Sequence, residues 1–183
     1  RCASGVYNSL AILYQDPQYQ LPLDRAHPFA ICAEQKTDIY RLTCYEQMNT
    51  LALWATGGNF KKAAADAASV SEPEFAAVAL ESLASWAAHA ELTGPVSNIV
   101  TECGSVPEAL FASCINGFAA GYIEFGPPEH EHERALALCS DPGVPASIKP
   151  SCYRRVLWLT STSRGAEAQA AVCATVPEQF RVY

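Results

Sequence analysis

Eight cysteines carry the clearest chemistry in this sequence, and their spacing separates metal binding and redox catalysis from structural disulfides. None belongs to a Cys-x-x-Cys or Cys-x-x-Cys-His motif, which argues against zinc ribbons, thioredoxin-type sites and covalently attached haem. Six of them form three pairs with similar short separations: Cys32–Cys44, Cys103–Cys114 and Cys139–Cys152. We therefore predict three disulfides and no cofactor.

The segments around these pairs repeat each other. The ten residues that end at Cys114 align without a gap to the ten that end at Cys152, and both contain Val-Pro followed later by Ser-Cys. Another unit has Ser69 in place of the first cysteine and Leu80 in place of the second. Because both cysteines are missing together there, we expect the two to bond to each other in the units that have them.

The outer cysteines, Cys2 and Cys173, lie in repeat units that are incomplete in the given sequence. The segment Cys173–Glu178 matches Cys103–Glu108 position for position, whereas nothing before Cys2 matches Cys139. We expect the chain to be a segment of a longer repeat protein, with the partners of Cys2 and Cys173 outside the given sequence. The alternatives are free thiols or a bond between these two cysteines.

A cluster of alternating Glu and His at 129–133 is a second candidate site. With a further ligand, His130 and His132 could hold a divalent metal. Residues two apart point in different directions on a helix, however, whereas metal-binding pairs on helices use i, i+4 spacing. The alternative is that acidic residues after Pro127-Pro128 begin a helix and interact favourably with its dipole.

The sequence offers little for catalysis. Nucleophilic catalysis needs a nucleophile, a histidine and an orienting group that converge, and His27 and His89 lie in stretches typical of helix surfaces or cores. Gly57-Gly58 is interpreted as a helix stop rather than a phosphate loop, and neither a Gly-rich phosphate motif nor HExxH is present. We predict no catalytic residues.

Four residues close behind paired cysteines are candidate binding residues. Tyr45 follows Cys44 directly, and Tyr153, Arg154 and Arg155 follow Cys152. Equivalent positions in stacked helical units line a stripe, and tyrosine and arginine are common contact anchors. The alternative for the two tyrosines is packing between units, which suits their amphipathic rings.

Helices must position these residues. Apolar side chains recur at helical spacing, alanine is frequent in 63–90, and no strand-like alternation is present. Shorter first helices are predicted at 24–33, 60–69, 96–103, 129–139 and 165–173. Longer second helices are predicted at 2–15, 38–56, 73–91, 107–125 and 147–162. Expected stops are Gly57-Gly58, Gly94-Pro95, Gly126-Pro127 and Gly165. Capping boxes are expected at Ser105/Glu108 and Thr175/Glu178.

We thus predict an all-α fold, a solenoid of about five stacked antiparallel helical hairpins in one segment spanning 1–183. Its units fall at approximately 1–17, 18–57, 58–94, 95–126 and 127–164, with 165–183 as a partial unit. A disulfide that closes so short a loop contributes about 3 kcal/mol by loop entropy.

Helical hairpins that are each closed by one disulfide resemble the Sel1-like, tetratricopeptide-related repeats of cysteine-rich secreted proteins. Ile12-Leu13-Tyr14 and Gly117-Phe118-Ala119-Ala120-Gly121-Tyr122 resemble fragments of the Leu-Gly-x-x-Tyr-x-x-Gly signature of that family. The resemblance covers most of the chain but is limited to the general architecture, because the paired cysteines are farther apart here than in that family. It implies the architecture and carries over no activity and no site residue.

Charge and redox chemistry narrow the function. The formal net charge of −7 argues against nucleic-acid binding, and no apolar run is long enough to span a membrane. Several disulfides imply a periplasmic, cell-surface or secreted location, the alternative being reduced cysteines in the cytosol. We expect a non-enzymatic interaction or scaffold module for another protein or an extracellular polymer, alone or as a subunit of a larger assembly. The alternatives are a ligand- or cell-wall-glycan-binding protein or hydrolase, or a metal or haem carrier using His130 and His132.

Overall fold

The structure is a computed structural model that describes residues 2–19 and 21–181, apart from the side chain of Cys2. The described residues form eleven α-helices and no strand, which confirms the all-α prediction. The helices are α1 (Cys2–Gln15), α2 (Ala30–Ala33), α3 (Asp38–Gln47), α4 (Asn49–Ala55), α5 (Phe60–Ala68), α6 (Pro73–Ala87), α7 (Val96–Cys103), α8 (Glu108–Phe125), α9 (Glu131–Ser140), α10 (Lys149–Arg164) and α11 (Ala166–Thr175). Short 3₁₀ helices occupy Ala88–Glu91 and Glu178–Phe180.

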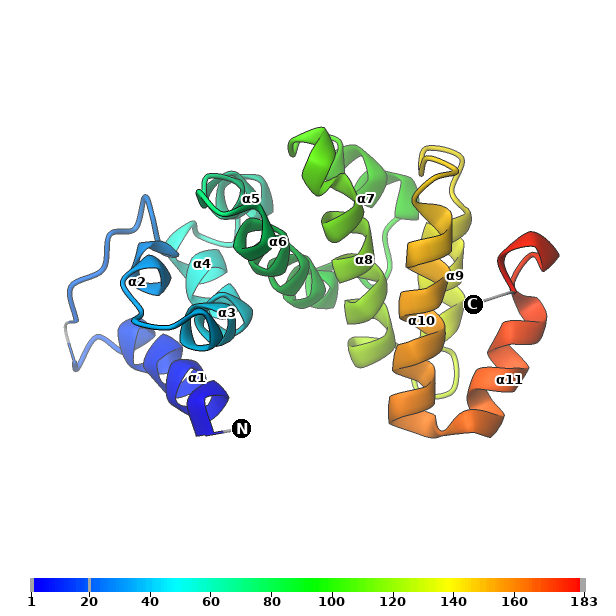
Figure 1. Ribbon diagram of the computed structural model, residues 1–183, viewed down its shortest axis with the longest axis horizontal. Helices are drawn as coiled ribbons and strands as arrows, with labels where there is room; N and C mark the ends of the chain where they lie inside the picture. Colours follow the sequence, from blue (N-terminus) through cyan, green and yellow to red (C-terminus); the bar gives the residue numbers. More distant parts are fainter. Residues whose placement is uncertain (1, 20, 182–183) are drawn as a thin grey trace.

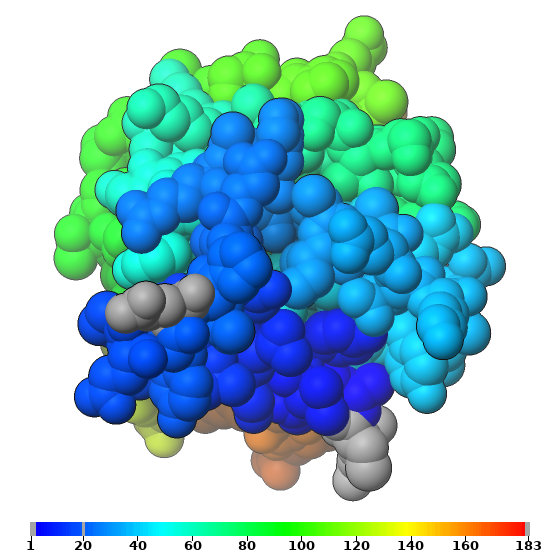
Figure 2. Space-filling view, turned by 90° about the vertical axis from the view of Figure 1, so that its left-hand side faces the viewer, coloured from blue at the N-terminus to red at the C-terminus, as the bar shows by residue number. Residues whose placement is uncertain are grey.

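From α1 to α11, successive groups of neighbouring helices follow one another along the long axis of the molecule (Figure 1). The longer helices pack against each other in succession: α1 against α3, α3 against α6, α6 against α8, and α8 against α10. Figure 2 views the N-terminal end, which α1 and the segment after it cover. One continuous apolar core runs through these contacts. No described helix combines the length and the apolar character needed to cross a bilayer.

Three disulfides join shorter helices to longer ones, as predicted. Cys32–Cys44 links α2 to α3, Cys103–Cys114 links α7 to α8, and Cys139–Cys152 links α9 to α10, with Cα–Cα distances of 5.4, 5.6 and 5.6 Å. The pair α5–α6 has no disulfide: Ser69 bonds to the Asp66 carbonyl, and Leu80 is fully buried. Apolar packing therefore holds that pair together without a covalent link.

A close helix contact lies between α6 and α8 and depends on two glycines. A Cβ atom on Gly117 would overlap the carbonyl oxygen of Glu81 and lie 2.7 Å from the Cβ of Ala84. A Cβ atom on Gly121 would overlap the carbonyl oxygen of Ser85 in the same way. The two glycines lie one turn apart, so they form a notch that admits the backbone of α6.

Two predicted helices are shorter or interrupted. Of the helix expected at 24–33 only α2 forms, because the carboxylate of Asp66, on α5, bonds to His27 (3.0 Å) and to the backbone N–H of Phe29 (3.2 Å) and holds this segment in a loop. The helix expected at 38–56 breaks at Met48 into α3 and α4. There the side chain of Asn49 bonds to local backbone and to α6, in competition with the helical hydrogen bonds.

The predicted capping boxes are wrong, although the helix boundaries near them are right. The hydroxyl of Ser105 donates to the carbonyl of Glu102, and that of Thr175 donates to the carbonyl of Val172. Both hydroxyls therefore close the preceding helix, and Pro107 is the N-cap residue of α8. The stop at Gly57-Gly58 is confirmed, since both glycines adopt positive φ angles of 65° and 78°.

Candidate binding groove

The predicted tyrosine anchors lie inside the protein, which corrects their assignment to a contact surface. Tyr45 is 2% exposed and stacks on Phe75 of α6, with ring centroids 5.5 Å apart. Tyr153 is 1% exposed and stacks on Phe180, with centroids 5.1 Å apart. Each ring thus packs against a phenylalanine from an element later in the chain, because the core gains more from an aromatic contact than from exposing the ring. These rings take the alternative role of packing between helices.

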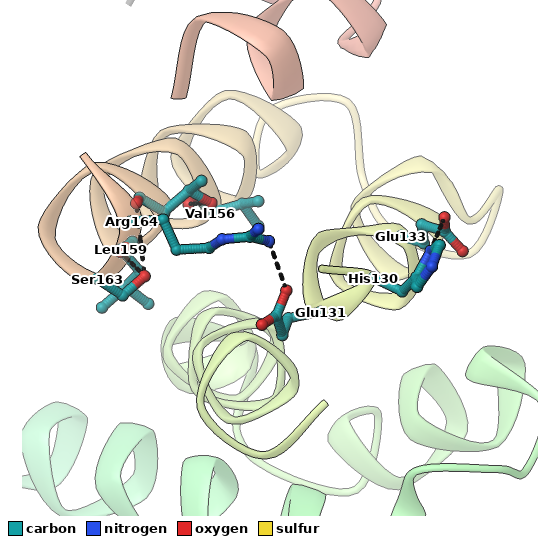
Figure 3. Close-up of polar contacts among 8 residues, drawn as sticks. His130, Glu131, Glu133, Val156, Leu159, Ser163 and Arg164 are labelled. Atoms are coloured by element: carbon teal, nitrogen blue, oxygen red, sulfur yellow. Dashed lines mark hydrogen bonds and ion pairs between the residues drawn. The ribbon is translucent and has the colours of Figure 1, made fainter. Parts of the chain in front are cut away.

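The two predicted histidine ligands do not gather a metal site. His130 bonds to Glu133 at 2.7 Å, while Glu131 points to Arg164 on α10 at 3.0 Å (Figure 3). No group of three or more histidine, cysteine or acidic side chains suited to a metal occurs in residues 2–19 and 21–181. The bond to Glu133 raises the pKa of His130 above its usual value and lowers the pKa of Glu133. This contact stabilises the start of α9.

The cysteines outside the three disulfides are Cys2 and Cys173. Cys173 is partly buried on α11 and forms no disulfide with a described residue. The side chain of Cys2 lies outside the described residues. The partners predicted for both cysteines therefore stay predictions.

An open cavity of about 680 Å³ crosses the longer helices, with Arg155 of α10 at one end and Asn8 of α1 at the other. Its lining residues come from α1, α3, α4, α6, α8 and α10: Asn8, Glu46, Gln47, Asn49, Thr50, Val78, Glu81, Ser82, Ser85, Trp86, Glu124 and Arg155. A second cavity of about 640 Å³ shares Ser85, Glu124 and Arg155 with it and extends along α10 to Arg164. The two cavities adjoin at these shared residues, and together we call them the groove.

Arg155 is the predicted binding residue that the structure places in the groove. Its guanidinium group lies 2.7 Å from the carboxylate of Glu81 on α6 and 5.2 Å from the ring centroid of Trp158. Arg154, its neighbour, is exposed on α10 and does not line either cavity. Arg155 therefore reaches from α10 past α8 to α6 across the middle of the groove.

Acidic side chains dominate the groove. The two cavities are lined by only two guanidinium groups, those of Arg155 and Arg164. They are lined by five carboxylates: Glu46, Glu81, Glu124, Glu129 and Glu131. Both arginines are engaged in ion pairs, with Glu81 and with Glu131. Burial raises the pKa of Glu81, and Arg155 opposes this effect. The remaining carboxylates leave the groove with a net negative charge.

An exposed indole borders the groove. Trp86, on α6, is 43% exposed and lines the first cavity and a neighbouring depression that also contains Trp54. Its ring stands at 90° to that of Phe125 with centroids 5.4 Å apart, which restrains its orientation. An aromatic face next to carboxylates can bind a cation or an apolar surface.

The sequence contained a pattern that could have identified Trp86 as a candidate residue, because its position can be compared between the aligned repeat segments. Trp86 stands six residues after Leu80, and Trp158 stands six residues after Cys152, at the equivalent place. Glu81 and Glu124 had no such signal, because their role depends on which helices become neighbours.

Two carboxylates of the groove differ in their surroundings. Glu124 is exposed, whereas Glu81 is partly buried and paired with Arg155.

No family model, curated protein or solved structure matches this chain.

Proposed function

We propose that this protein is a non-enzymatic binding module of an extracytoplasmic compartment that holds an extended partner in the groove. The observation that carries the proposal is the pair of adjoining cavities, of about 680 and 640 Å³, which share Ser85, Glu124 and Arg155. A groove that crosses helix after helix suits a partner longer than a single small molecule, such as a protein segment or another polymer.

The proposed architecture supports an extended binding site. We take the successive packing of α1, α3, α6, α8 and α10 as a solenoid segment of stacked helical hairpins, similar in plan to Sel1-like repeats. In a solenoid each unit contacts its neighbours, and equivalent positions create one long binding surface. The stacking of Tyr45 on Phe75 and of Tyr153 on Phe180 repeats the same kind of contact between units.

The proposed compartment is the periplasm, the cell surface or the medium. Three disulfides with fully buried cysteines support it, because such bonds persist in oxidising environments and are rare where glutathione and thioredoxin keep thiols reduced.

A glycan hydrolase is the second candidate, and the raised pKa of Glu81 is the observation that favours it. General acids in glycosidases are carboxyl groups whose pKa burial raises. The ion pair of Glu81 with Arg155 at 2.7 Å favours the charged carboxylate instead, which suits a structural or binding role better than proton donation.

A groove-filling variant tests the proposed function. Ser85 lines both cavities, and Ser85→Tyr places a bulky ring at their junction. Ser97→Tyr makes the same change at an exposed position of α7 that lines neither cavity, and serves as the matched control. The oxidised protein is used to select binders from a library of random peptides displayed on phage and from an array of glycans.

We expect selected ligands to bind the unmodified protein and Ser97→Tyr equally and to lose at least about tenfold in affinity for Ser85→Tyr, a difference of about 1.4 kcal/mol. Equal binding by all three proteins, or no selected ligand at all, contradicts the proposal. Cleavage of a glycan that Glu81→Gln abolishes supports the hydrolase instead.

A further inference from the structure

The charge and aromatic content of the groove point to the chemistry of its occupant, an inference that rests on the proposed function. Glu46 lies near the α1 end of the groove, and Glu124 lies where the two cavities join. Both side chains are exposed, in contrast to the paired Glu81. An exposed carboxylate attracts a mobile cation at little desolvation cost, so the groove favours a positively charged ligand over a neutral or acidic one.

Trp86 adds a second feature that suits a cation. Its ring is open to solvent on the groove side of α6, and Phe125 holds it edge to face. An indole is the best of the aromatic side chains at attracting an ammonium or guanidinium group placed over its face. The groove thus offers an aromatic face and carboxylates within one cavity, which together complement the side chains of lysine and arginine.

The amide side chains in the groove favour a peptide as the ligand that carries these positive charges. The side chains of Asn8 and Gln47 line the first cavity, and each can both donate and accept hydrogen bonds. A peptide backbone presents the same alternation of donors and acceptors along an extended chain. The negative charge of the groove excludes the phosphate backbone of a nucleic acid as the occupant.

We propose that the groove binds an extended, basic peptide segment of a partner protein, with lysine or arginine side chains beside Trp86, Glu124 and Glu46. Charge complementarity selects this occupant over an acidic or neutral peptide. A polymer of free amino sugars shares the positive charge and is distinguished from a peptide by experiment.

Fluorescently labelled peptides of ten residues test the proposal on the oxidised protein. The probes are alternating Gly-Lys, Gly-Ser and Gly-Glu sequences, together with a chitosan oligosaccharide of similar length, and binding is followed by fluorescence anisotropy at low and at physiological salt. We expect the Gly-Lys peptide to bind most tightly, and its affinity to fall as salt screens the carboxylates.

Matched variants locate the binding. Glu46→Gln/Glu124→Gln removes two carboxylates from the groove, and Glu34→Gln/Glu167→Gln removes two exposed carboxylates that line neither cavity. We expect the groove variant to weaken Gly-Lys binding by about tenfold and the control by less than about twofold, because only the groove carboxylates can pair with the bound peptide. Trp86→Leu, which keeps apolar volume, is expected to weaken it by about fivefold.

The possible outcomes distinguish a failure of this inference from a failure of the proposed function. Equal losses in the two double variants mean that net charge alone attracts the peptide, and they overturn the inference. Preference for Gly-Ser or Gly-Glu peptides, sensitive to Ser85→Tyr, overturns the inference but leaves the proposed function standing. Tighter binding of chitosan than of Gly-Lys replaces the peptide by an amino-sugar polymer. A lack of binding by every probe and every library ligand removes both proposals.

Discussion

Arg155 has two roles at the residue scale, since it pairs with Glu81 and borders the groove. We predict that Arg155→Met raises the pKa of Glu81 further, because the positive charge that opposes the effect of burial is lost. The variant is expected to lower the free energy of unfolding by about 1 kcal/mol, a value discounted for the partial exposure of both side chains. Carboxyl ¹³C NMR and urea denaturation measure the two effects. Arg155→Lys retains the charge and should recover most of both; a Glu81 pKa that does not move in Arg155→Met contradicts the pairing.

The contact between His130 and Glu133 makes a local pH response predictable. The raised pKa of His130 means that this contact stabilises the folded state while His130 is protonated and is lost as pH rises through that pKa. The lowered pKa of Glu133 means that the contact is also lost as pH falls through the pKa of Glu133. It is therefore strongest at mildly acidic pH.

We predict that Glu133→Gln lowers the pKa of His130 toward its ordinary value of about 6.5, because the hydrogen-bonded carboxylate is removed. NMR titration of the imidazole protons measures this shift. Glu108→Gln removes the same charge from the first turn of α8 and serves as the control. An equal shift in both variants would show that the pKa of His130 responds to net charge rather than to its partner.

At the scale of the elements, the notch on α8 decides how closely α6 and α8 approach. We predict that Gly121→Ala lowers the free energy of unfolding by about 1–3 kcal/mol, because its Cβ overlaps the backbone of α6. Gly5→Ala is the matched control: Gly5 lies in α1 with no atom within 4 Å of an added Cβ. That variant should gain up to about 1 kcal/mol from helix propensity. Equal effects in thermal or urea unfolding would contradict the close contact.

Each disulfide links one shorter helix to one longer helix. We predict that Cys103→Ala/Cys114→Ala lowers the free energy of unfolding by about 3 kcal/mol, mainly because the unfolded chain regains the entropy of its closed loop. Cys173→Ala, which removes a cysteine without a described disulfide, should cost less than about 1 kcal/mol. Urea denaturation of the oxidised proteins measures both, and similar losses in the two variants would contradict a special role for the bond.

At the scale of the whole molecule, stability is unevenly distributed. Nine residues of α8 are buried, whereas Val172 is the buried residue of α11. We predict that amide hydrogens of α6 and α8 exchange most slowly with solvent and that those of α11 and residues 21–28 exchange first. Mass spectrometry of peptides after deuterium labelling measures this order. Uniform exchange across the chain would indicate one cooperative unit instead of a graded stack.

Much of the architecture was predictable because it depends on local patterns. The joint loss of two cysteines at Ser69 and Leu80 indicated disulfides within units, and the bonds form with the predicted pairing. Most helix boundaries follow glycine and proline positions. The helix expected at 24–33 was wrong because a distant group competes, since Asp66 bonds the loop at His27. The capping boxes were wrong because the hydroxyls of Ser105 and Thr175 bond to the preceding helix instead.

The groove was much less predictable. Arg155 was identified from its place after a paired cysteine, but the same reasoning selected Tyr45, which is buried against Phe75. Position within a unit does not reveal which side of a helix the next helix covers. Glu124 became a candidate only when the packing of α6 and α8 placed it in the groove.

The disulfide pairing and most of the helices could be predicted from the amino-acid sequence, since helix propensity and short loop closure involve residues close along the chain. Which side chains are buried and which line the groove depends on how the helices pack. The reason is that the contact of Arg155 with Glu81 joins residues on helices separated by α8, and that contact exists only once the notch on α8 has set the distance between helices.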